Sequence, residues 1–509
     1  MSLDPITLQV LSGALRAICD EMGAALIRSA HSANIKERRD CSTALFDAAG
    51  ELVMQAEHIP VHLGSMPAAV AAILAREQLP GQAWILNDPF AGGTHLPDVT
   101  LISPLFASPQ ADAELIGFAA SRAHHADIGG PTAAGMPARS RTLAEEGVVI
   151  PPTVADEETL RDLAEQMRAP SERLADFRAQ RAANRLAEAR IAALVARQGL
   201  ELVREGMATV LEHAERRARA ALAALPDGRW SAEDSLEAED GSLIPLRLTA
   251  ALKAGRLRLD FAGSADQVQG NLNCPLPVTR SAALFAVRAL TDPDAPPSAG
   301  AARAVEILVP EGSVLNARAG AAVAAGNVET SSRVADLVIE ALGEAVDGPA
   351  QGQGTMNNLT LAADGFTYYE TIGGGQGACH DSDGADAVHV AMSNTLNTPV
   401  EALEQAIPVR VRELSVRRDS GGRGAHRGGD GVIREIEALA TMRFTLITER
   451  RGSRPRGRHG GGDGAAGVNR LNGEPLPAKA EGTLSAGDIL RIETPGGGGY
   501  GDISRRLDG

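Results

Sequence analysis

The sequence has few cysteines and few aromatic residues, and each shortage excludes a class of protein. Its four cysteines, Cys19, Cys41, Cys274 and Cys379, lie far apart in the 509 residues and form no CxxC pair. This spacing argues against a zinc ribbon and is typical of reduced thiols in a cytoplasmic protein. Aromatic residues make up only 3% of the chain, so base-stacking surfaces for nucleic acids are not expected.

Negative residues outnumber positive ones, and long apolar runs are missing. The formal net charge is −16, which repels nucleic acids and anionic membranes and predicts that neither is a partner. No run of about 18 apolar residues could span a bilayer. The first residues carry a charge at Asp4 and lack the apolar segment and cleavage site of a signal peptide. We therefore expect a soluble, cytoplasmic protein.

Two common catalytic motifs are missing. The chain contains no GxxxxGK[ST] loop for nucleotide phosphates and no GxSxG elbow for a serine nucleophile. The GGGQG stretch at 373–377 follows a predicted strand, but neither a helical run nor a suitably spaced acid follows it. Glycine turns between strands explain it better, so the chain is not expected to bind ATP by itself.

The apolar pattern predicts an α+β chain with three regions. Residues 1–155 contain an amphipathic helix over 5–30, a hairpin near 41–55 and strands over 98–107 and 114–123, which indicates a mixed region. Residues 156–225 are rich in Ala, Arg, Glu and Leu and predict a helical segment with two long helices. Residues 226–509 predict β-rich, glycine-dense structure with inserted helices, in which the glycines allow tight turns and close backbone packing.

Histidines and carboxylates gather where two predicted strands begin and end. In THLPD, a glycine-containing loop presents His95 and Asp98 just before a strand, and in HHADIGG a strand leads into His124, His125 and Asp127. Imidazole nitrogens with a carboxylate form a ligand set for Zn²⁺, Mn²⁺ or Fe²⁺. The pair His95 and Asp98 alone is better explained by a loop histidine that caps a carbonyl. The cluster as a whole predicts a metal site.

The two adjacent histidines are not expected to share one role. Neighbouring side chains on a strand point to opposite faces. We therefore expect one of His124 and His125 to bind the metal and the other to pack or bond elsewhere.

Two further segments allow two interpretations each. Asp40 ends the charged run KERRD, which is typical of a solvated salt-bridge cluster, but the strand that follows could carry the Asp40 side chain inward. His58 and His62 are four residues apart, yet Pro60 between them disfavours a helical ligand pair. We interpret their segment as a loop that lines a pocket, with a direct ligand role as the alternative.

Seven ordered motifs resemble the hydantoinase B/oxoprolinase family: NDPFAGGTHLPD, HHADIGG, EEGVVIPP, AGNVETSSR, YYETIGGGQGA, GGDGVIREI and TPGGGGYGD. That family includes the second subunits of ATP-dependent hydantoinases and lactamases, the C-terminal half of 5-oxoprolinase, and subunits of acetone and acetophenone carboxylases. The similarity extends from about residue 4 to residue 505. Together the seven motifs are specific, although no single one is.

The resemblance implies a partner and a site. The partner is a hydantoinase-A-type subunit, which binds ATP and phosphorylates the substrate oxygen before a metal centre in the B-type chain attacks the activated species. By position the resemblance carries the metal ligands onto His95, Asp98 and His124, with Asp40 as a fourth. The metal would be Mn²⁺, Zn²⁺ or Fe²⁺.

The resemblance does not assign the catalytic residues outside the ligand set, and it allows more than one reaction. His125, Asp127 and Glu146 are candidates for catalytic residues that transfer protons or support the ligands. The predicted function is ring opening of a 5-oxoproline-, hydantoin- or lactam-type cyclic amide, favoured because 509 residues are fewer than we expect for the large subunit of acetone carboxylase. The alternatives are a subunit of an ATP-dependent ketone carboxylase and a non-catalytic scaffold for an ATPase.

Overall fold

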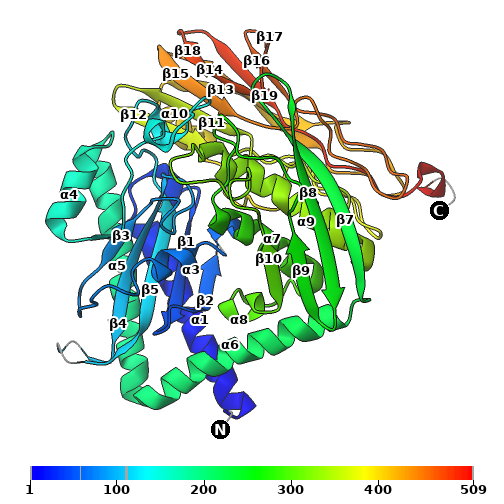
Figure 1. Cartoon of the computed structure of the whole chain (residues 1–509). Coiled ribbons are helices and arrows are strands. Elements are labelled where there is room, and N and C mark those ends of the chain that lie inside the picture. The colour runs from blue at the N-terminus through cyan, green and yellow to red at the C-terminus, as the bar shows by residue number, and fades with distance from the viewer. Residues whose placement is uncertain (1–2, 58, 63, 109, 111–112, 507–509) are drawn as a thin grey trace.

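The computed structural model describes residues 3–57, 59–62, 64–108, 110 and 113–506, and over these it combines helices with four separate sheets (Figure 1). This is the α+β class that the sequence predicts. The α-helices are α1 (Pro5–Ser29), α2 (Ala33–Lys36), α3 (Met66–Ala71), α4 (Glu157–Glu165), α5 (Pro170–Gln198), α6 (Leu200–Ala223), α7 (Leu276–Thr291), α8 (Ala299–Ala302), α9 (Ser331–Val346) and α10 (Val400–Ala406).

The N-terminal region is built on a six-stranded sheet in the order β2-β1-β5-β4-β3-β6, in which each neighbouring pair is antiparallel. Its strands are β1 (Cys41–Asp47), β2 (Leu52–Glu57), β3 (Trp84–Leu86), β4 (Asp98–Phe106), β5 (Leu115–His124) and β6 (Thr153–Val154). The predicted hairpin and the two predicted strands thus become β1–β2, β4 and β5.

Both faces of this sheet are covered, because strand side chains alternate between them. In β1, Leu45 belongs to the core that α1 and α5 close on one face. Ala44 and Phe46 belong to the core on the opposite face, together with residues of α3. This arrangement explains why β1 is buried along almost its whole length.

Helix α1 starts where the sequence predicts. The Asp4 carboxylate accepts hydrogen bonds from the backbone N–H groups of Ile6 and Thr7, which would otherwise lack partners at a helix start. From there Leu11, Leu15 and further residues at three- and four-residue spacing bury one face of the helix against the sheet.

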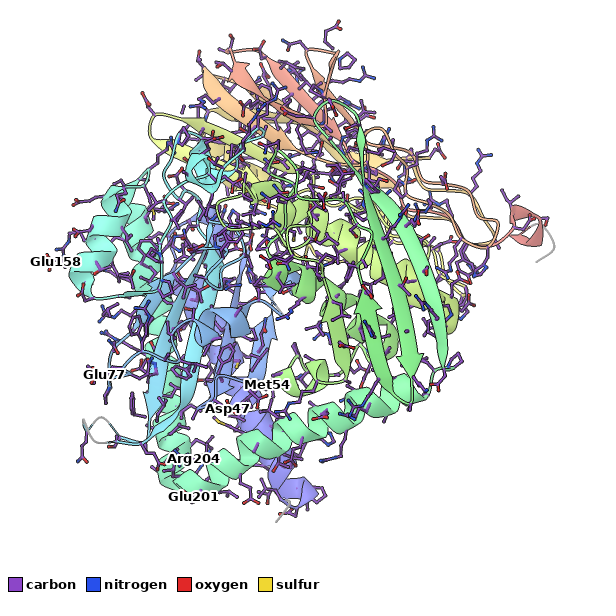
Figure 2. All side chains as sticks on the ribbon, viewed as in Figure 1. Asp47, Met54, Glu77, Glu158, Glu201 and Arg204 are labelled. Carbon is purple, nitrogen blue, oxygen red and sulfur yellow. The ribbon has the colours of Figure 1, made fainter. Side chains whose placement is uncertain are left out.

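The predicted helical segment consists of α4, α5 and α6. α5 packs on β4, β5 and α1, so it is a layer of the N-terminal fold. α6 runs beneath the six-stranded sheet and on to the next one (Figure 1). At its start Glu201 points to solvent, whereas Arg204 turns back to Glu114 and Leu115 at the beginning of β5 (Figure 2).

A second sheet, in the order β10-β9-β8-β7, carries α7 and α9 on its inner face. Its strands are β7 (Gly228–Glu237), β8 (Leu243–Lys253), β9 (Arg256–Asp260) and β10 (Val305–Leu308). Alternate residues of β8 are buried, the pattern of a sheet with one covered face. Just before α9 the chain forms a π-helical turn, η4 (Gly326–Thr330).

Two further sheets share one apolar core and form a C-terminal sandwich. One sheet has the order β12-β11-β15-β18 and the other β13-β14-β19-β16-β17. Their strands are β11 (Asn358–Ala363), β12 (Phe366–Glu370), β13 (Val409–Arg417), β14 (Gly431–Ala438), β15 (Met442–Ile447), β16 (Val468–Leu471), β17 (Glu474–Leu476), β18 (Lys479–Leu484) and β19 (Ile489–Glu493).

The glycine-rich loops of this region pack backbone against backbone, as predicted. A Cβ atom on Gly375 would lie 2.0 Å from the carbonyl oxygen of Gly429 and 2.2 Å from the nitrogen of Gly497. The amide of Gly497 in turn donates to the oxygen of Gly429 at 2.9 Å. Any larger residue would separate these loops, which explains the density of glycine.

The secondary structure changes character near residues 155 and 225, and the proposed division at these two points stays a prediction. All four cysteines are free thiols, and three of them are buried. Among the described helices, none combines the length and the apolar composition that crossing a membrane requires.

Candidate metal centre

Three of the predicted ligands come together at one edge of the six-stranded sheet. Asp98 begins β4 and pairs directly with His124, the last residue of β5. His95 reaches them from the loop before β4, which contains Gly92 and Gly93. A Cβ atom on Gly93 would lie 2.2 Å from the carbonyl oxygen of Asn87, so this loop can close only with glycine.

The potential ligand atoms of the His95–Asp98–His124 group face one another. Nε2 of His95 lies 3.2 Å from Nδ1 of His124. Oδ1 of Asp98 lies 3.3 Å from Nδ1 of His124 and 3.6 Å from Nε2 of His95. Ligands bound about 2.1 Å from one tetrahedral ion are about 3.4 Å apart, so the triangle has the size of one face of a coordination shell.

The protonation states also suit a metal. Burial lowers the pKa of His95 to about 3, so its imidazole is neutral near pH 7, the form that binds metals. Burial by itself would raise the pKa of Asp98, but His95, His124 and His62 hold it well below its usual value. Two imidazoles and one carboxylate favour Mn²⁺, Zn²⁺ or Fe²⁺ over Ca²⁺.

The second oxygen of Asp98, Oδ2, is held by other residues. It accepts a hydrogen bond from the Thr94 hydroxyl at 2.6 Å and another from Nδ2 of Asn327 at 3.4 Å. Asn327 lies in η4, far along the chain and within a motif to which the sequence analysis assigned no role. These contacts fix the direction in which Oδ1 points, as supporting residues do around metal ligands.

His62 is a site residue that spacing alone did not assign. It lies in a single turn of 3-10 helix, η1 (Pro60–His62), rather than in a regular α-helix. Its Nδ1 bonds to the Ser42 hydroxyl at 2.9 Å, and its Nε2 lies 3.5 Å from Oδ2 of Asp98. That buried Nε2 has no hydrogen-bond partner among the described residues. His58, the other member of the predicted pair, lies outside the described residues.

Tyr369 fixes the ring of His124. The two rings are stacked, with centroids 4.6 Å apart and planes inclined by 11°. The hydroxyl of Tyr369 donates to Oδ1 of Asn358 at 2.7 Å. The buried Nε2 of His124 and Nδ1 of His95 have no hydrogen-bond partner among the described residues. Both are the ring nitrogens outside the triangle, since Nε2 of His95 and Nδ1 of His124 are the atoms that face Asp98.

Asp40, the predicted fourth ligand, is buried beside the site but is not part of the three-residue group. Its backbone carbonyl accepts a hydrogen bond from the amide of His124 at 3.0 Å. The start of β1 is thereby joined to the end of β5. A ligand role for Asp40 stays a prediction.

His125 lies on the other side of the strand end from His124. Its Nε2 is 2.9 Å from Oε1 of Gln180 in α5, and its ring contacts Phe177. Burial lowers the pKa of His125 to about 4. The two histidines therefore contact different partners, which follows from the alternation of side chains along a strand.

The carboxylate of Asp127 holds the loop after β5. It accepts hydrogen bonds from the amides of Gly129 at 2.8 Å and Ala134 at 2.9 Å. It also forms an ion pair with Arg168 at 3.1 Å and accepts the Arg168 amide at 2.9 Å. With four donors on two oxygens, Asp127 is occupied by structural contacts.

The buried carboxylate of Glu146 joins its loop to the chain segment that precedes η4. It accepts hydrogen bonds from the Ser140 hydroxyl at 2.7 Å and from the amides of Val323 and Ala324 at 3.0 Å. Burial raises the pKa of Glu146 to about 7. Because Asn327 follows this segment, Glu146 helps to position a residue that contacts Asp98.

A buried acid in η4, Glu329, was not singled out from the sequence. Its Oε1 accepts hydrogen bonds from Nδ2 of Asn358 at 2.9 Å and the amide of Met356 at 3.3 Å, and Oε2 has no described partner. Burial and the neighbouring Glu449 raise the pKa of Glu329 to about 8. Through Asn358, Glu329 is linked to the Tyr369 that stacks on His124.

The raised pKa of Glu329 predicts a pH-dependent stability. The folded chain keeps a proton that the unfolded chain releases above about pH 4.5, so the free energy of unfolding should fall as pH rises from about 4.5 to 8. We expect Glu329→Gln to remove this part of the decline, which amounts to at most a few kcal/mol. Denaturant unfolding of both proteins across that range tests it, and equal pH slopes would contradict it.

Sequence comparison finds one matching family and several similar proteins. The hydantoinase B/oxoprolinase family matches residues 4–503. The chain is 39% identical to 5-oxoprolinase 1 of Arabidopsis thaliana over 98% of its own length, but spans only 42% of that protein. It is 37% identical to an uncharacterized protein of Methanocaldococcus jannaschii (99% of this chain, 92% of that one). It is 29% identical to a Pseudomonas chain provisionally named as a D-/L-hydantoinase subunit (99% and 91%).

Solved structures show the same fold. The ATP-dependent caprolactamase of Pseudomonas jessenii superposes with a TM-score of 0.92 at 28% identity, over 99% of this chain and 92% of that one. Nucleotide-free acetone carboxylase superposes with a TM-score of 0.84 at 19% identity, over 99% and 76%; at that identity the likeness concerns the fold alone. The molecule is thus an α+β protein with a buried His–Asp–His group. The chain belongs to the hydantoinase B/oxoprolinase family.

Proposed function

We propose that this chain is the metal-dependent subunit of an ATP-dependent cyclic amidohydrolase, which opens a 5-oxoproline-, hydantoin- or lactam-type ring. The observation that carries the proposal is the buried His95–Asp98–His124 group in a chain whose fold superposes on an ATP-dependent caprolactamase with a TM-score of 0.92. The 5-oxoprolinase and hydantoinase names of its relatives support the same class of substrate.

We propose further that ATP binds to a hydantoinase-A-type partner. This chain has no phosphate-cradling loop motif. It spans 42% of a 5-oxoprolinase, and a relative of comparable length is named as one subunit of a hydantoinase. Both observations support a second component that supplies the nucleotide site.

The chemistry follows from the weakness of amides as electrophiles. The partner would transfer the γ-phosphoryl group of ATP to the amide oxygen. Water would then add to the activated carbon, and the C–N bond would break with its electron pair and a proton going to nitrogen. A second water would release phosphate from the resulting acyl phosphate. One cyclic amide, one ATP and two waters thus give the ring-opened amino acid, ADP and phosphate.

Three groups of residues in the chain are proposed to have separate roles in this reaction. His95, Asp98 and His124 would hold a divalent transition metal, which lowers the pKa of bound water from about 16 toward 7. Thr94, Asn327 and Tyr369 would orient the ligands. His125, Asp127 and Glu146 are proposed to keep the strand end and its neighbouring segments in place, since their contacts are with Gln180, Arg168 and the amides before η4.

The direct test is to co-express the chain with an A-type subunit and assay a panel of 5-oxoproline, hydantoin and caprolactam. We expect ATP-dependent formation of a ring-opened product from at least one of them, without bicarbonate, and none from either subunit alone. The reason is that activation and water attack are assigned to different chains.

The same assay separates the alternatives. Turnover of acetone or acetophenone that requires bicarbonate and gives a carboxylated product would favour the ketone carboxylase. If the metal-loaded complex hydrolysed ATP but turned over no cyclic amide or ketone, the non-catalytic scaffold would be favoured.

A further inference from the structure

Arg38 is a fully buried cation close to the metal centre. It belongs to the charged run KERRD, in which Lys36 and Arg39 are exposed but Arg38 and Asp40 are buried. Arg39 has a φ of +56°, so the backbone turns at this residue. The side chains of Arg38 and Asp40, on either side of the turn, both point inward. The Arg38 side chain has no exposed surface.

No described carboxylate lies within 4.0 Å of this guanidinium. Ion pairs with acids are formed by four other fully buried arginines, Arg173, Arg333, Arg434 and Arg450. Arg122 has no ion pair among the described side chains either, but each of its three side-chain nitrogens donates a hydrogen bond to protein. Glu370, on the neighbouring strand β12, is already paired with Arg434 at 3.1 Å. Burying an unpaired charge is unfavourable, so an anion is expected at Arg38 during function.

The surroundings of Arg38 provide neutral hydrogen-bonding groups. Its Nη1 donates to the carbonyl oxygen of Tyr369 at 2.5 Å, and its Nη2 lies 3.0 Å from the hydroxyl of Thr371 and 3.4 Å from that of Thr395. The two hydroxyls also bond to each other. The buried Nε of Arg38 has no partner in the described part of the chain, which leaves one donor for a ligand.

Polar side chains link this place to a cavity. Nε2 of His389 lies 3.5 Å from the Thr395 hydroxyl. His389 also lines a cavity of about 540 Å³ between α9 and the glycine-rich loops. Side-chain contacts therefore run from this cavity through His389 and Thr395 to Arg38.

The same aromatic ring contacts Arg38 and the metal centre. The guanidinium carbon of Arg38 lies 5.0 Å from the centroid of Tyr369, and the ring of His124 lies 4.6 Å from it. An anion at Arg38 would thus be within one side chain of the His95–Asp98–His124 group.

We propose that Arg38, with the hydroxyls of Thr371 and Thr395, forms a phosphate-binding subsite next to the metal centre. Its ligand is the phosphoryl group of the activated substrate and, after ring opening, inorganic phosphate. A guanidinium with adjacent hydroxyls suits the several acceptor oxygens of a phosphoryl group. The identity of the ligand rests on the proposed function, because only an ATP-dependent reaction brings a phosphoryl group to this place.

The test is calorimetric titration of the purified, metal-loaded chain with inorganic phosphate, and with acetate for comparison. We expect saturable phosphate binding that Arg38→Gln weakens at least about 10-fold, since one charge-assisted hydrogen-bond donor is lost. Lys36→Gln, which removes the same charge from an exposed residue of the same segment, should leave phosphate affinity unchanged. Metal content and circular dichroism of each variant show whether the site is intact.

Thr371→Val is a second variant in case Arg38→Gln does not fold, because it removes one hydroxyl at nearly constant volume. It should weaken phosphate binding about 3- to 10-fold. Absence of saturable phosphate binding, equal affinities in wild type and in a folded variant, or tighter binding of acetate than of phosphate would each overturn the subsite. Ring opening is measured separately, so phosphate binding lost on Arg38→Gln without any lactam turnover would contradict the proposed function and leave the subsite in place.

Discussion

His95→Ala is expected to abolish ring opening while the chain still folds and still binds its partner. The substitution removes one of three potential ligand atoms that lie within 3.2–3.6 Å of one another, and metal content should fall with it. Loss of an outer residue that supports a ligand costs about 10- to 100-fold, so loss of the ligand itself should lower product formation by more than about 100-fold. Elemental analysis and the lactam assay measure the two effects.

The consumption of ATP provides an internal check. Because phosphorylation is assigned to the partner, we expect His95→Ala to leave slow ATP hydrolysis that is uncoupled from product. His213→Ala, a histidine exposed on α6, is the matched control and should retain both metal and turnover. Near-normal product formation by His95→Ala would remove His95 from the mechanism.

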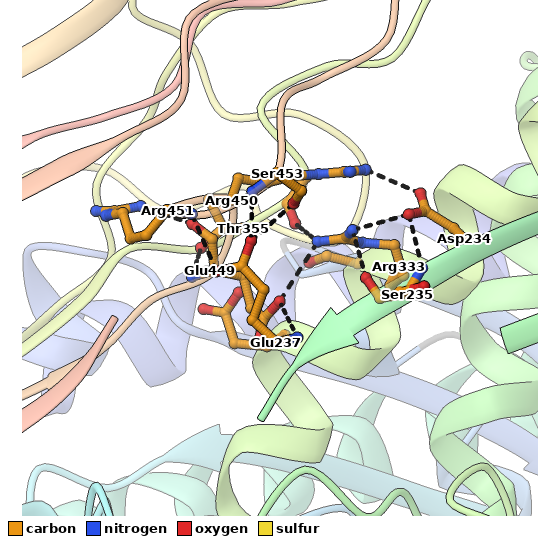
Figure 3. Close-up of polar contacts among 12 residues, drawn as sticks. Asp234, Ser235, Glu237, Arg333, Thr355, Glu449, Arg450, Arg451 and Ser453 are labelled. Atoms are coloured by element: carbon orange, nitrogen blue, oxygen red, sulfur yellow. Dashed lines mark hydrogen bonds and ion pairs between the residues drawn. The ribbon is translucent and has the colours of Figure 1, made fainter. Parts of the chain in front are cut away.

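Asp234→Ala is expected to cause the largest loss of stability. Asp234 in β7 accepts hydrogen bonds from Arg333 of α9 at 3.1 Å and from Arg450, after β15, at 3.0 Å (Figure 3). Burial would raise the pKa of Asp234, but these arginines and Arg456 hold it well below its usual value. Removing the carboxylate leaves two guanidiniums buried without it, and breaking such a pair costs about 3–5 kcal/mol.

Thermal and guanidinium unfolding measure this loss. Asp240→Ala changes an exposed aspartate in the turn between β7 and β8 and should leave the unfolding midpoints nearly unchanged. If the two variants unfolded alike, the buried network would contribute little to holding β7, α9 and the C-terminal loops together.

Helix starts, turns and strands could be predicted wherever the residues of a short segment define them. Asp4 and the spaced apolar residues after it define α1, and Asp47 to Gly50 define the turn between β1 and β2. The gathering of histidines and carboxylates at two strand ends predicted a metal site, and the family resemblance selected His124 over His125. The site forms because adjacent antiparallel strands place the start of one beside the end of the other.

Residues contributed by distant segments could not be predicted in the same way. Asn327 and Tyr369 meet the site only because η4 and β12 pack against the end of the six-stranded sheet. Arg38 shows the same difficulty in a charged run, since its burial depends on the turn at Arg39 and on contacts with Tyr369 and Thr371.

By itself the sequence determined the α+β class, the main strands around the site and a metal-site prediction at two strand ends, since periodicity, turn residues and ligand chemistry act over short distances. The choice of His95, Asp98 and His124 as the three ligands came from the resemblance to the hydantoinase B/oxoprolinase family. Only the tertiary structure decided that His62 lies beside Asp98, that Asp40 stands outside the three-residue group, and that Arg38 is buried without an acid. Side-chain direction and burial depend on which distant segments pack together, and this packing leaves no local pattern in the chain.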